Sequence, residues 1–190
     1  MWESRGRLAV IALMATAAVF QAAAEARAGS ATYQVLASAD DTAWSTGGNC
    51  ATCGQCYVPY TTNERRAYMR WPIRVPKGAT ITSAYLYMQF DGQLNSGDSA
   101  ASLELIDRDD CPNFSSNPGE LPVVAGQVSW TIGNVTPGAW VRSADIKTLV
   151  QAFIDRPGYD YGRYVGLRTG TISGCLLYTS DAADDLLCVD

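Results

Sequence analysis

Four cysteines lie in two segments of the chain and could form either disulfides or a metal site. Cys50, Cys53 and Cys56 are spaced by two residues each. Cys111 follows much later in the sequence. Four thiolates that include a C-x2-C spacing could hold a zinc ion. An exported protein favours two disulfides instead. Four cysteines allow three pairings, and full oxidation would require Cys111 to bond to one of the other three.

A short acidic segment offers a second kind of chemistry. Asp107, Asp109 and Asp110 form a carboxylate cluster, and Asp40-Asp41 adds two more carboxylates elsewhere. Calcium takes six to eight oxygen ligands from loops of this composition. We therefore name the three clustered aspartates as candidate ligands of a structural calcium ion, with a solvated acidic loop as the alternative. Glycoside hydrolysis needs two carboxylates that face each other across a cleft, and no sequence feature marks such a pair.

Aromatic side chains in expected loops could bind carbohydrate. An aromatic ring packs its apolar face against a ligand while a polar edge stays in water. Trp44, Tyr57 and Tyr60 are the better candidates because they fall in a segment rich in Gly, Thr, Asn and Cys. Trp130 and Trp140 are weaker candidates, since most aromatic residues of a small β protein belong to its core. Trp71 and Phe153 are expected in that core.

The N-terminal residues 1–28 have the pattern of a secretory signal peptide. Arg5 and Arg7 precede an apolar run at 8–20, and Ala26-Arg27-Ala28 resembles a cleavage site. The run is shorter than the ~20 apolar residues that a membrane-spanning helix needs, although an uncleaved anchor is the alternative. We therefore expect a secreted protein with no membrane-spanning segment.

Composition excludes several functional classes. The chain contains no histidine, so Ser-His and Cys-His nucleophile pairs and His-ligated metals are ruled out. Between residues 29 and 174 there are 13 acidic and 11 basic residues, a net charge of −2. A nucleic-acid partner would need a basic stripe, which is missing. Residues 29–174 suffice for one domain with its own core.

Hydrophobic periodicity predicts strands over most of this domain. Residues 67–71, 80–90 and 102–106 alternate between apolar and polar positions. Shorter strands are expected at 32–38, 128–130, 139–141 and 164–168, and a long loop at 39–63. One amphipathic helix is predicted at about 144–155, with Ser143 as its N-cap. The pattern predicts an all-β fold, a β-sandwich or jelly roll with one helix.

Two stretches resemble a known family. Residues 65–71 read RRAYMRW, and residues 76–87 read PKGATITSAYLY. They are similar to the "R-A-Y-L-R-F" and "I-P-x-G-A-T-I-T-S-A-x-L-x-L" motifs of DNRLRE-type modules, which are secreted jelly-roll domains related to carbohydrate-binding modules. The helix at 143–157 and Tyr161-Gly162 also resemble that family, so the likeness covers about residues 31–172. The cysteine-rich loop is absent from most members of the family.

The resemblance implies a non-catalytic module that binds polysaccharide or supports adhesion outside the cell, with no required cofactor. The alternatives are a ligand-free structural spacer stapled by disulfides and, as a third reading, a polysaccharide-degrading enzyme. Such modules are often attached to polysaccharide-degrading enzymes. A downstream catalytic domain, lost by truncation, is therefore a further expectation for the natural protein.

The tail at 175–190 is expected to be foreign to the protein. Residues 175–184 read CLLYTSDAAD, which resembles the translation of a transposon end and adaptor used in sequencing libraries. A real acidic tail is the alternative. On the first reading, Cys175 and Cys188 drop out of the cysteine count, and residues 175–190 either hang loose or occupy a vacant strand position.

Overall fold

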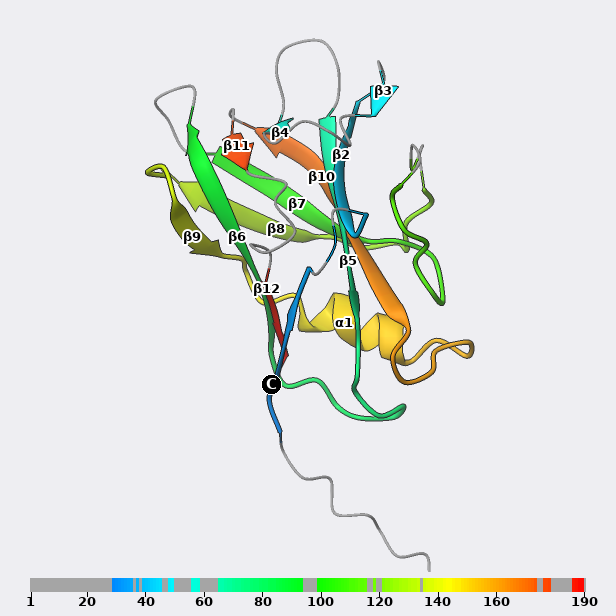
Figure 1. Cartoon of the computed structure of the whole chain (residues 1–190). Coiled ribbons are helices and arrows are strands. Elements are labelled where there is room, and N and C mark those ends of the chain that lie inside the picture. Colours follow the sequence, from blue (N-terminus) through cyan, green and yellow to red (C-terminus); the bar gives the residue numbers. More distant parts are fainter. Residues whose placement is uncertain are drawn as a thin grey trace, which may run out of the picture.

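The computed structural model describes residues 29–35, 37, 39–45, 48–49, 56–58, 65–93, 99–115, 118, 121–133, 135–173, 176–178 and 186–189. In this part of the chain, twelve strands form two antiparallel sheets, and one helix lies at one end of them (Figure 1). The expected all-β sandwich with a single helix is thus confirmed. Residues 1–28, the expected signal peptide, lie outside the described residues.

The first sheet is built around the ten-residue strand β6 and is called the β6 sheet here. Its strands are, in spatial order, β1 (Ala31–Gln34), β12 (Leu186–Val189), β6 (Ala84–Gln93), β11 (Leu176–Tyr178) and β4 (Cys56–Val58), with β9 (Ala139–Arg142) paired to β6 as well. β11 and β12 pair with successive parts of β6. The tail residues therefore fill a strand position, which is one of the two arrangements expected for them.

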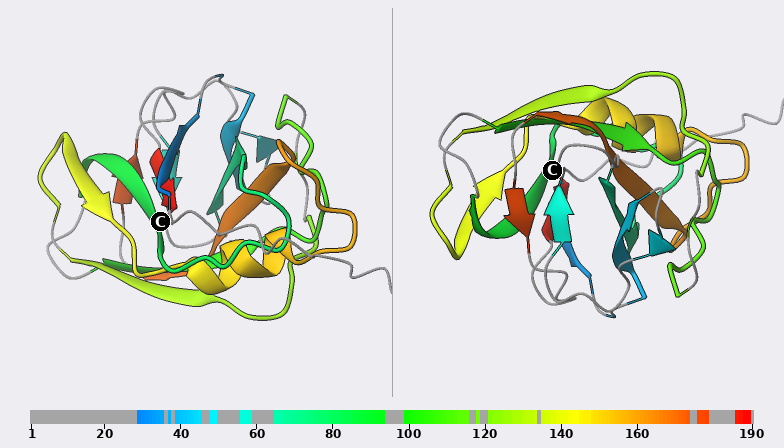
Figure 2. Two further views of the ribbon diagram at one scale, coloured as in Figure 1. Left: turned by 90° about the horizontal axis from the view of Figure 1, so that it is seen from below. Right: turned by 90° about the horizontal axis from the view of Figure 1, so that it is seen from above.

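The second sheet is called the β10 sheet. Its order is β3 (Gly48–Asn49), β2 (Asp41–Ser45), β5 (Arg65–Pro72), β10 (Tyr164–Ser173), β7 (Ser99–Leu105) and β8 (Val128–Gly133). End-on views show the two sheets on opposite sides of a common interior (Figure 2). β10 lies between β5 and β7, so it is at the centre of its sheet.

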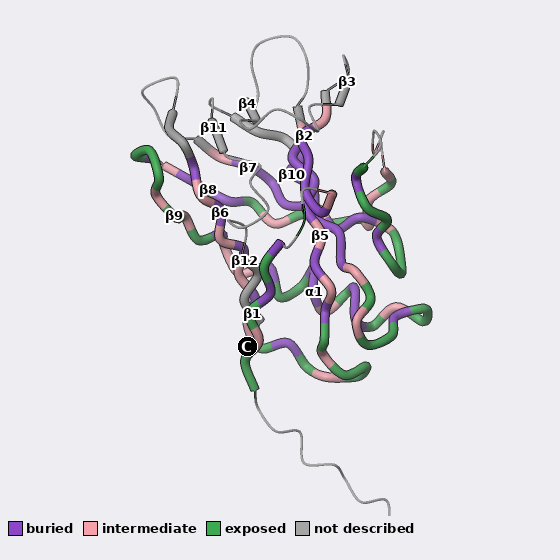
Figure 3. Tube along the Cα trace, in the orientation of Figure 1, coloured by how far each residue is buried: buried purple, intermediate pink, exposed green. Residues whose placement is uncertain are grey.

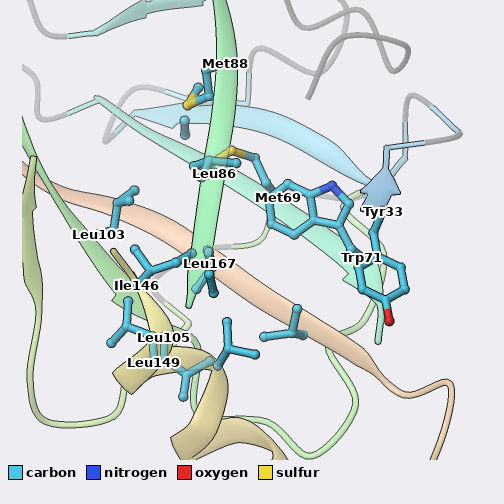
Figure 4. Packing of buried hydrophobic residues seen from close by; sticks show 14 of the residues in the cluster. Tyr33, Met69, Trp71, Leu86, Met88, Leu103, Leu105, Ile146, Leu149 and Leu167 are labelled. Carbon is cyan, nitrogen blue, oxygen red and sulfur yellow. The ribbon is translucent and has the colours of Figure 1, made fainter. Parts of the chain in front are cut away.

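Period-two alternation in both sheets fills the space between them. On β6, Leu86 and Met88 point inward, as the sequence predicted. Met69 and Trp71 on β5 and Leu167 on β10 meet them from the other sheet and are buried (Figures 3 and 4). Burial of apolar surface on this scale is the main stabilising contribution to such a fold.

The helix α1 (Lys147–Ile154) closes the lower end of the sandwich (Figure 1). Leu149, Val150, Phe153 and Ile154 form its buried stripe, and Phe153 is fully buried. The predicted N-cap is wrong: the helix follows Ile146, without a side-chain cap. The Ser143 hydroxyl instead accepts a hydrogen bond from the Leu86 amide at 2.9 Å, because the chain is still leaving the edge of β6 at that point.

A second apolar cluster lies on the outer face of the β10 sheet. Tyr68 on β5 points away from the sandwich and packs against Ile106, Cys111 and Phe114. The ring centroids of Tyr68 and Phe114 are 5.9 Å apart. Gly166 on β10 makes this packing possible, because a Cβ there would collide with the Cys111 Sγ atom. The 107–115 segment therefore covers this face of the sheet.

The predicted loop at 39–63 is only partly a loop. It contains β2, β3 and β4. β2 pairs along its whole length with β5, from Asp41 opposite Met69 to Ser45 opposite Arg65. Sequence patterning missed these strands because each has at most five residues, too few to display a period, and because Gly and Thr surround them.

Candidate functional site

The outer face of the β6 sheet gathers aromatic and hydrogen-bonding side chains. Tyr85, Tyr87 and Gln89 alternate with the buried residues of β6 and are half-buried. The register places Arg142 of β9 opposite Tyr87, and Trp140 opposite Gln89. We call these five residues the β6–β9 face.

Trp140 is the most informative member of this face. Its side chain is 42 % exposed, and it is one of two large apolar side chains that are exposed in the described part of the chain. The other is Tyr161, on a turn far along the sequence. Val141 and Ala139, the neighbours of Trp140, turn toward the core and pack against it. The β-strand alternation therefore forces Trp140 outward, over a surface already lined by tyrosines.

Arg142 is held in place by an aromatic ring rather than by a carboxylate. Its guanidinium carbon lies 4.6 Å from the centroid of the Tyr85 ring, within the range of a cation–π contact. Among the described residues, no acidic side chain forms an ion pair with it. The described partner of this guanidinium is therefore the Tyr85 ring.

The backbone of β9 is tied to the interior of the sandwich. Trp130 on β8 is buried, packs against Phe90, and donates its indole N–H to the carbonyl oxygen of Arg142 at 3.1 Å. At the other end of the strand, Gln89 donates to the carbonyl oxygen of Gly138 at 3.1 Å. These bonds fix the position of β9, so the spacing between its outward side chains and those of β6 is set before any ligand arrives.

The structure describes only part of the aromatic set predicted from the sequence. Trp44 on β2 is half-buried and packs against the cluster around Tyr68 and Phe114. Tyr57 belongs to β4 in the other sheet, where the structure describes its backbone position. Tyr60 lies outside the described residues. The structure therefore gives Trp44 a packing role beneath the 107–115 segment.

Each of the three candidate calcium ligands faces an arginine. Arg156 bonds Asp109 Oδ1 at 2.6 Å through Nε and Asp107 Oδ1 at 2.9 Å through Nη1. Asp110 pairs with Arg163 at 2.8 Å, and its second oxygen accepts the Tyr164 amide at 2.9 Å. The hydrogen bond that Arg156 donates to Asp109 is the main reason that the pKa of Arg156 is raised.

These contacts link the acidic segment to the C-terminal end of α1 and to the start of β10. No group of three acidic or cysteine side chains that could hold a metal occurs among the residues the structure covers. Two of the carboxylates bond Arg156 and the third bonds Arg163, and the calcium hypothesis stays a prediction.

Cys111 is a free, buried thiol in the structure, with an exposed fraction of 1 %. Burial raises the pKa of Cys111 to about 12. The structure does not show the expected bond from Cys111 to the 50–56 segment, and the Cys111 sulfur lies close to Gly166 and Ile106. Cys50 and Cys53 lie outside the described residues, and Cys56 is described only as part of β4. Their oxidation state stays a prediction.

The alternation predicted at 80–90 puts Tyr85, Tyr87 and Gln89 on one side of the strand, but it does not pair them with β9. Trp140 had been named among the weaker aromatic candidates, and Arg142 had not been named. The alternation at 85, 87 and 89 and at 140 and 142 is the sequence pattern that could have indicated the β6–β9 face. What was missing was the antiparallel register that makes these two short series neighbours.

Comparison of the sequence with known protein families and with curated proteins finds no match to either. The motif-level likeness to DNRLRE-type modules therefore stays a prediction.

Proposed function

We propose that this chain is a secreted, non-catalytic module that binds polysaccharide on its β6–β9 face. The observation that carries the proposal is the exposed Trp140 beside Tyr87 and the stacked Arg142 on one rigid sheet face. The motif-level resemblance supports the same function class. No helix in the described part of the chain is long and apolar enough to cross a membrane.

The chemistry of the face suits a sugar ligand. One side of a pyranose ring presents C–H groups that pack against an aromatic face, while its hydroxyl groups point sideways. Trp140 and Tyr87 offer the aromatic surfaces. Gln89 and Arg142 offer hydrogen-bond donors beside them. A protein partner would instead be expected to meet a larger continuous apolar patch than these separated rings form.

Pre-organisation favours binding by this face. The strand backbones are fixed by ladder hydrogen bonds and by the Trp130 bond to Arg142. Few rotatable side chains remain to be ordered, which reduces the entropic cost of association. A non-catalytic role is proposed because the face carries no paired carboxylates, which glycoside hydrolysis uses. The acidic residues described at 107–110 are engaged with arginines elsewhere.

Affinity electrophoresis tests the proposal. The full chain is run through gels that contain xylan, mixed-linkage β-glucan, galactomannan, polygalacturonate or chondroitin sulfate. Retardation in at least one gel is expected. Trp140→Ala should weaken that binding roughly tenfold or more, as truncation of a central aromatic contact does. Tyr161→Ala removes the other exposed aromatic side chain and is the matched control, which should migrate like the parent chain.

Two outcomes would contradict the proposal. If Trp140→Ala is retarded as strongly as the parent, the binding site lies elsewhere, with Trp44 and Tyr60 as the next residues to replace. If no polysaccharide retards the folded parent chain, the module is better explained as a structural spacer.

A further inference from the structure

We infer that the β6–β9 face binds an internal stretch of an extended glycan, at least three sugar units long, that crosses obliquely from β9 to β6. This inference rests on the proposed function and specifies how the same surface would hold its ligand. It is drawn from the register of two strands and from the one ring-stacked arginine on this face.

The register between β6 and β9 determines how long the β6–β9 face is. Trp140 lies at the level of Gln89, and Arg142 lies at the level of Tyr87. Tyr85 is one further step along β6. At about 3.4 Å per residue, the levels of Gln89 and Tyr85 are roughly 14 Å apart, a span that accommodates roughly three consecutive sugar rings.

The same register also determines the direction in which an extended ligand would cross the face. The exposed indole is on β9, whereas the tyrosines are on β6, about 4.8 Å to the side. A path from Trp140 through Tyr87 to the Tyr85–Arg142 pair therefore runs diagonally across the two strands. A single sugar could contact only one of these three positions. The full face is used only by a ligand that is extended along this diagonal.

The third position is a charged hydrogen-bonding group rather than a stacking platform. The Arg142 guanidinium covers the ring of Tyr85 at 4.6 Å, so the ring is not free to stack on sugar from that side. The planar guanidinium presents several N–H donors in a fixed fork. Tyr85 thus acts as a positioning residue that aims Arg142 at the ligand, while Tyr87 and Trp140 make the stacking contacts.

Neither end of this path is closed by a described side chain that would recognise a chain terminus. The side chains exposed on β9 are Trp140 and Arg142, and both are contact positions on the path rather than caps beyond its ends. Internal segments of a polymer and free oligosaccharides of sufficient length should therefore bind alike.

Calorimetric titration with a length series tests the inference. The polysaccharide that retards the full chain most strongly is partially hydrolysed, and its oligomers of one to six units are separated. Monomers and dimers should bind at least roughly tenfold more weakly than tetramers, and affinity should level off at three to four units, as expected when successive contacts are filled. Equal affinity for dimer and hexamer would overturn the extended mode while leaving polysaccharide binding intact.

Three variants test the role of Tyr85. Tyr85→Phe keeps the ring and should bind the tetramer like the parent chain. Tyr85→Leu should lose affinity to the same extent as Arg142→Ala, with an unchanged thermal midpoint in all three. A loss in Tyr85→Phe equal to that in Tyr85→Leu would show that the hydroxyl contacts the ligand directly and would overturn the positioning role. If no polysaccharide binds the parent chain, the proposed function and this inference fail together.

Discussion

The outer faces of the two sheets arise from the same strand alternation, but one is covered by other residues and the other is exposed. Each face carries an arginine over a tyrosine ring: Arg70 lies 4.0 Å from the centroid of Tyr164, and Arg142 lies 4.6 Å from that of Tyr85. Arg70 also contacts Asp40 at 2.6 Å and donates to the carbonyl oxygen of Cys111 at 2.8 Å. Arg142 has no such carboxylate partner among the described residues.

This difference distinguishes an outer sheet face that is packed into the structure from one that stays exposed. On the β10 sheet, Arg70 is paired with Asp40, and Phe114 and Cys111 pack against Tyr68. A similar pair, Arg168 and Glu104, lies further along the same sheet at 2.7 Å. On the β6 sheet, the described contact of the Arg142 guanidinium is the Tyr85 ring, and Trp140 is exposed. We expect the closed face to matter for stability and the open face for binding, and four experiments test that division.

The largest effect is expected from Arg70→Met. It leaves Asp40, which is buried, without its charge partner, and loss of one member of a buried pair costs about 3–5 kcal/mol. Urea unfolding of the parent and variant measures the change. Arg70→Met combined with Asp40→Asn should recover part of the loss. A cost below about 1 kcal/mol for the single variant would show that the closed face contributes little to stability.

Gly166→Ala should give the next largest loss, about 1–3 kcal/mol, through overpacking against Cys111 and Ile106. Thermal unfolding of the variant would show it. Combining the change with Cys111→Ala removes the sulfur from the collision and should restore part of the stability. Gly138→Ala is a control with open space at its Cβ but a strained backbone, since its φ is 79°. If the double variant is no more stable than Gly166→Ala, the sulfur is not the obstructing atom.

A pH-dependent effect is expected from the titration of Cys111. Burial raises the pKa of its thiol from 9.0 to about 12, so the folded chain keeps a proton that the unfolded chain loses. The resulting stabilisation is present below pH 9 and is lost as pH rises from about 9 to 12. The free energy of unfolding should therefore fall less steeply in Cys111→Ser over this range. Tyr159, whose pKa burial raises to about 12, contributes to both proteins and cancels in the comparison.

The smallest effect on stability is expected on the open face. Arg142→Ala removes an exposed side chain with no ion pair to a described carboxylate, and its free energy of unfolding should stay within about 0.5 kcal/mol of the parent. Urea unfolding beside the Arg70→Met variant provides the direct contrast. A loss above about 2 kcal/mol would mean that Arg142 stabilises the fold and that the two outer faces do not differ in their contribution to stability.

Sequence reasoning predicted the fold well and the site only in part. Alternation identified the buried face of β6, and helical spacing identified Leu149 and Phe153, because both signals are local. The pairing of β9 with β6 is a long-range contact, so the joint face of Trp140 and Tyr87 could not be read from either segment alone. Spacing likewise suggested metal chemistry for Asp107, Asp109 and Asp110. The ion-pair partners of these residues, Arg156 and Arg163, lie about fifty residues away, so local spacing could not predict these pairs, and the calcium hypothesis stays a prediction.

The arginine contacts of the 107–115 segment imply that added salt should weaken the attachment of its acidic end more than that of its apolar end. Asp107, Asp109 and Asp110 have side chains between 43 % and 50 % exposed, so added electrolyte screens their pairs with Arg156 and Arg163. The Arg70–Asp40 pair lies deeper and is screened much less. In concentrated salt, amide hydrogens near Arg108 should exchange with solvent sooner, while the Cys111 and Phe114 amides, bonded to Tyr164 and Ala39, keep their protection. The 107–115 segment would then detach first at its acidic end, while its apolar end stays packed against the β10 sheet.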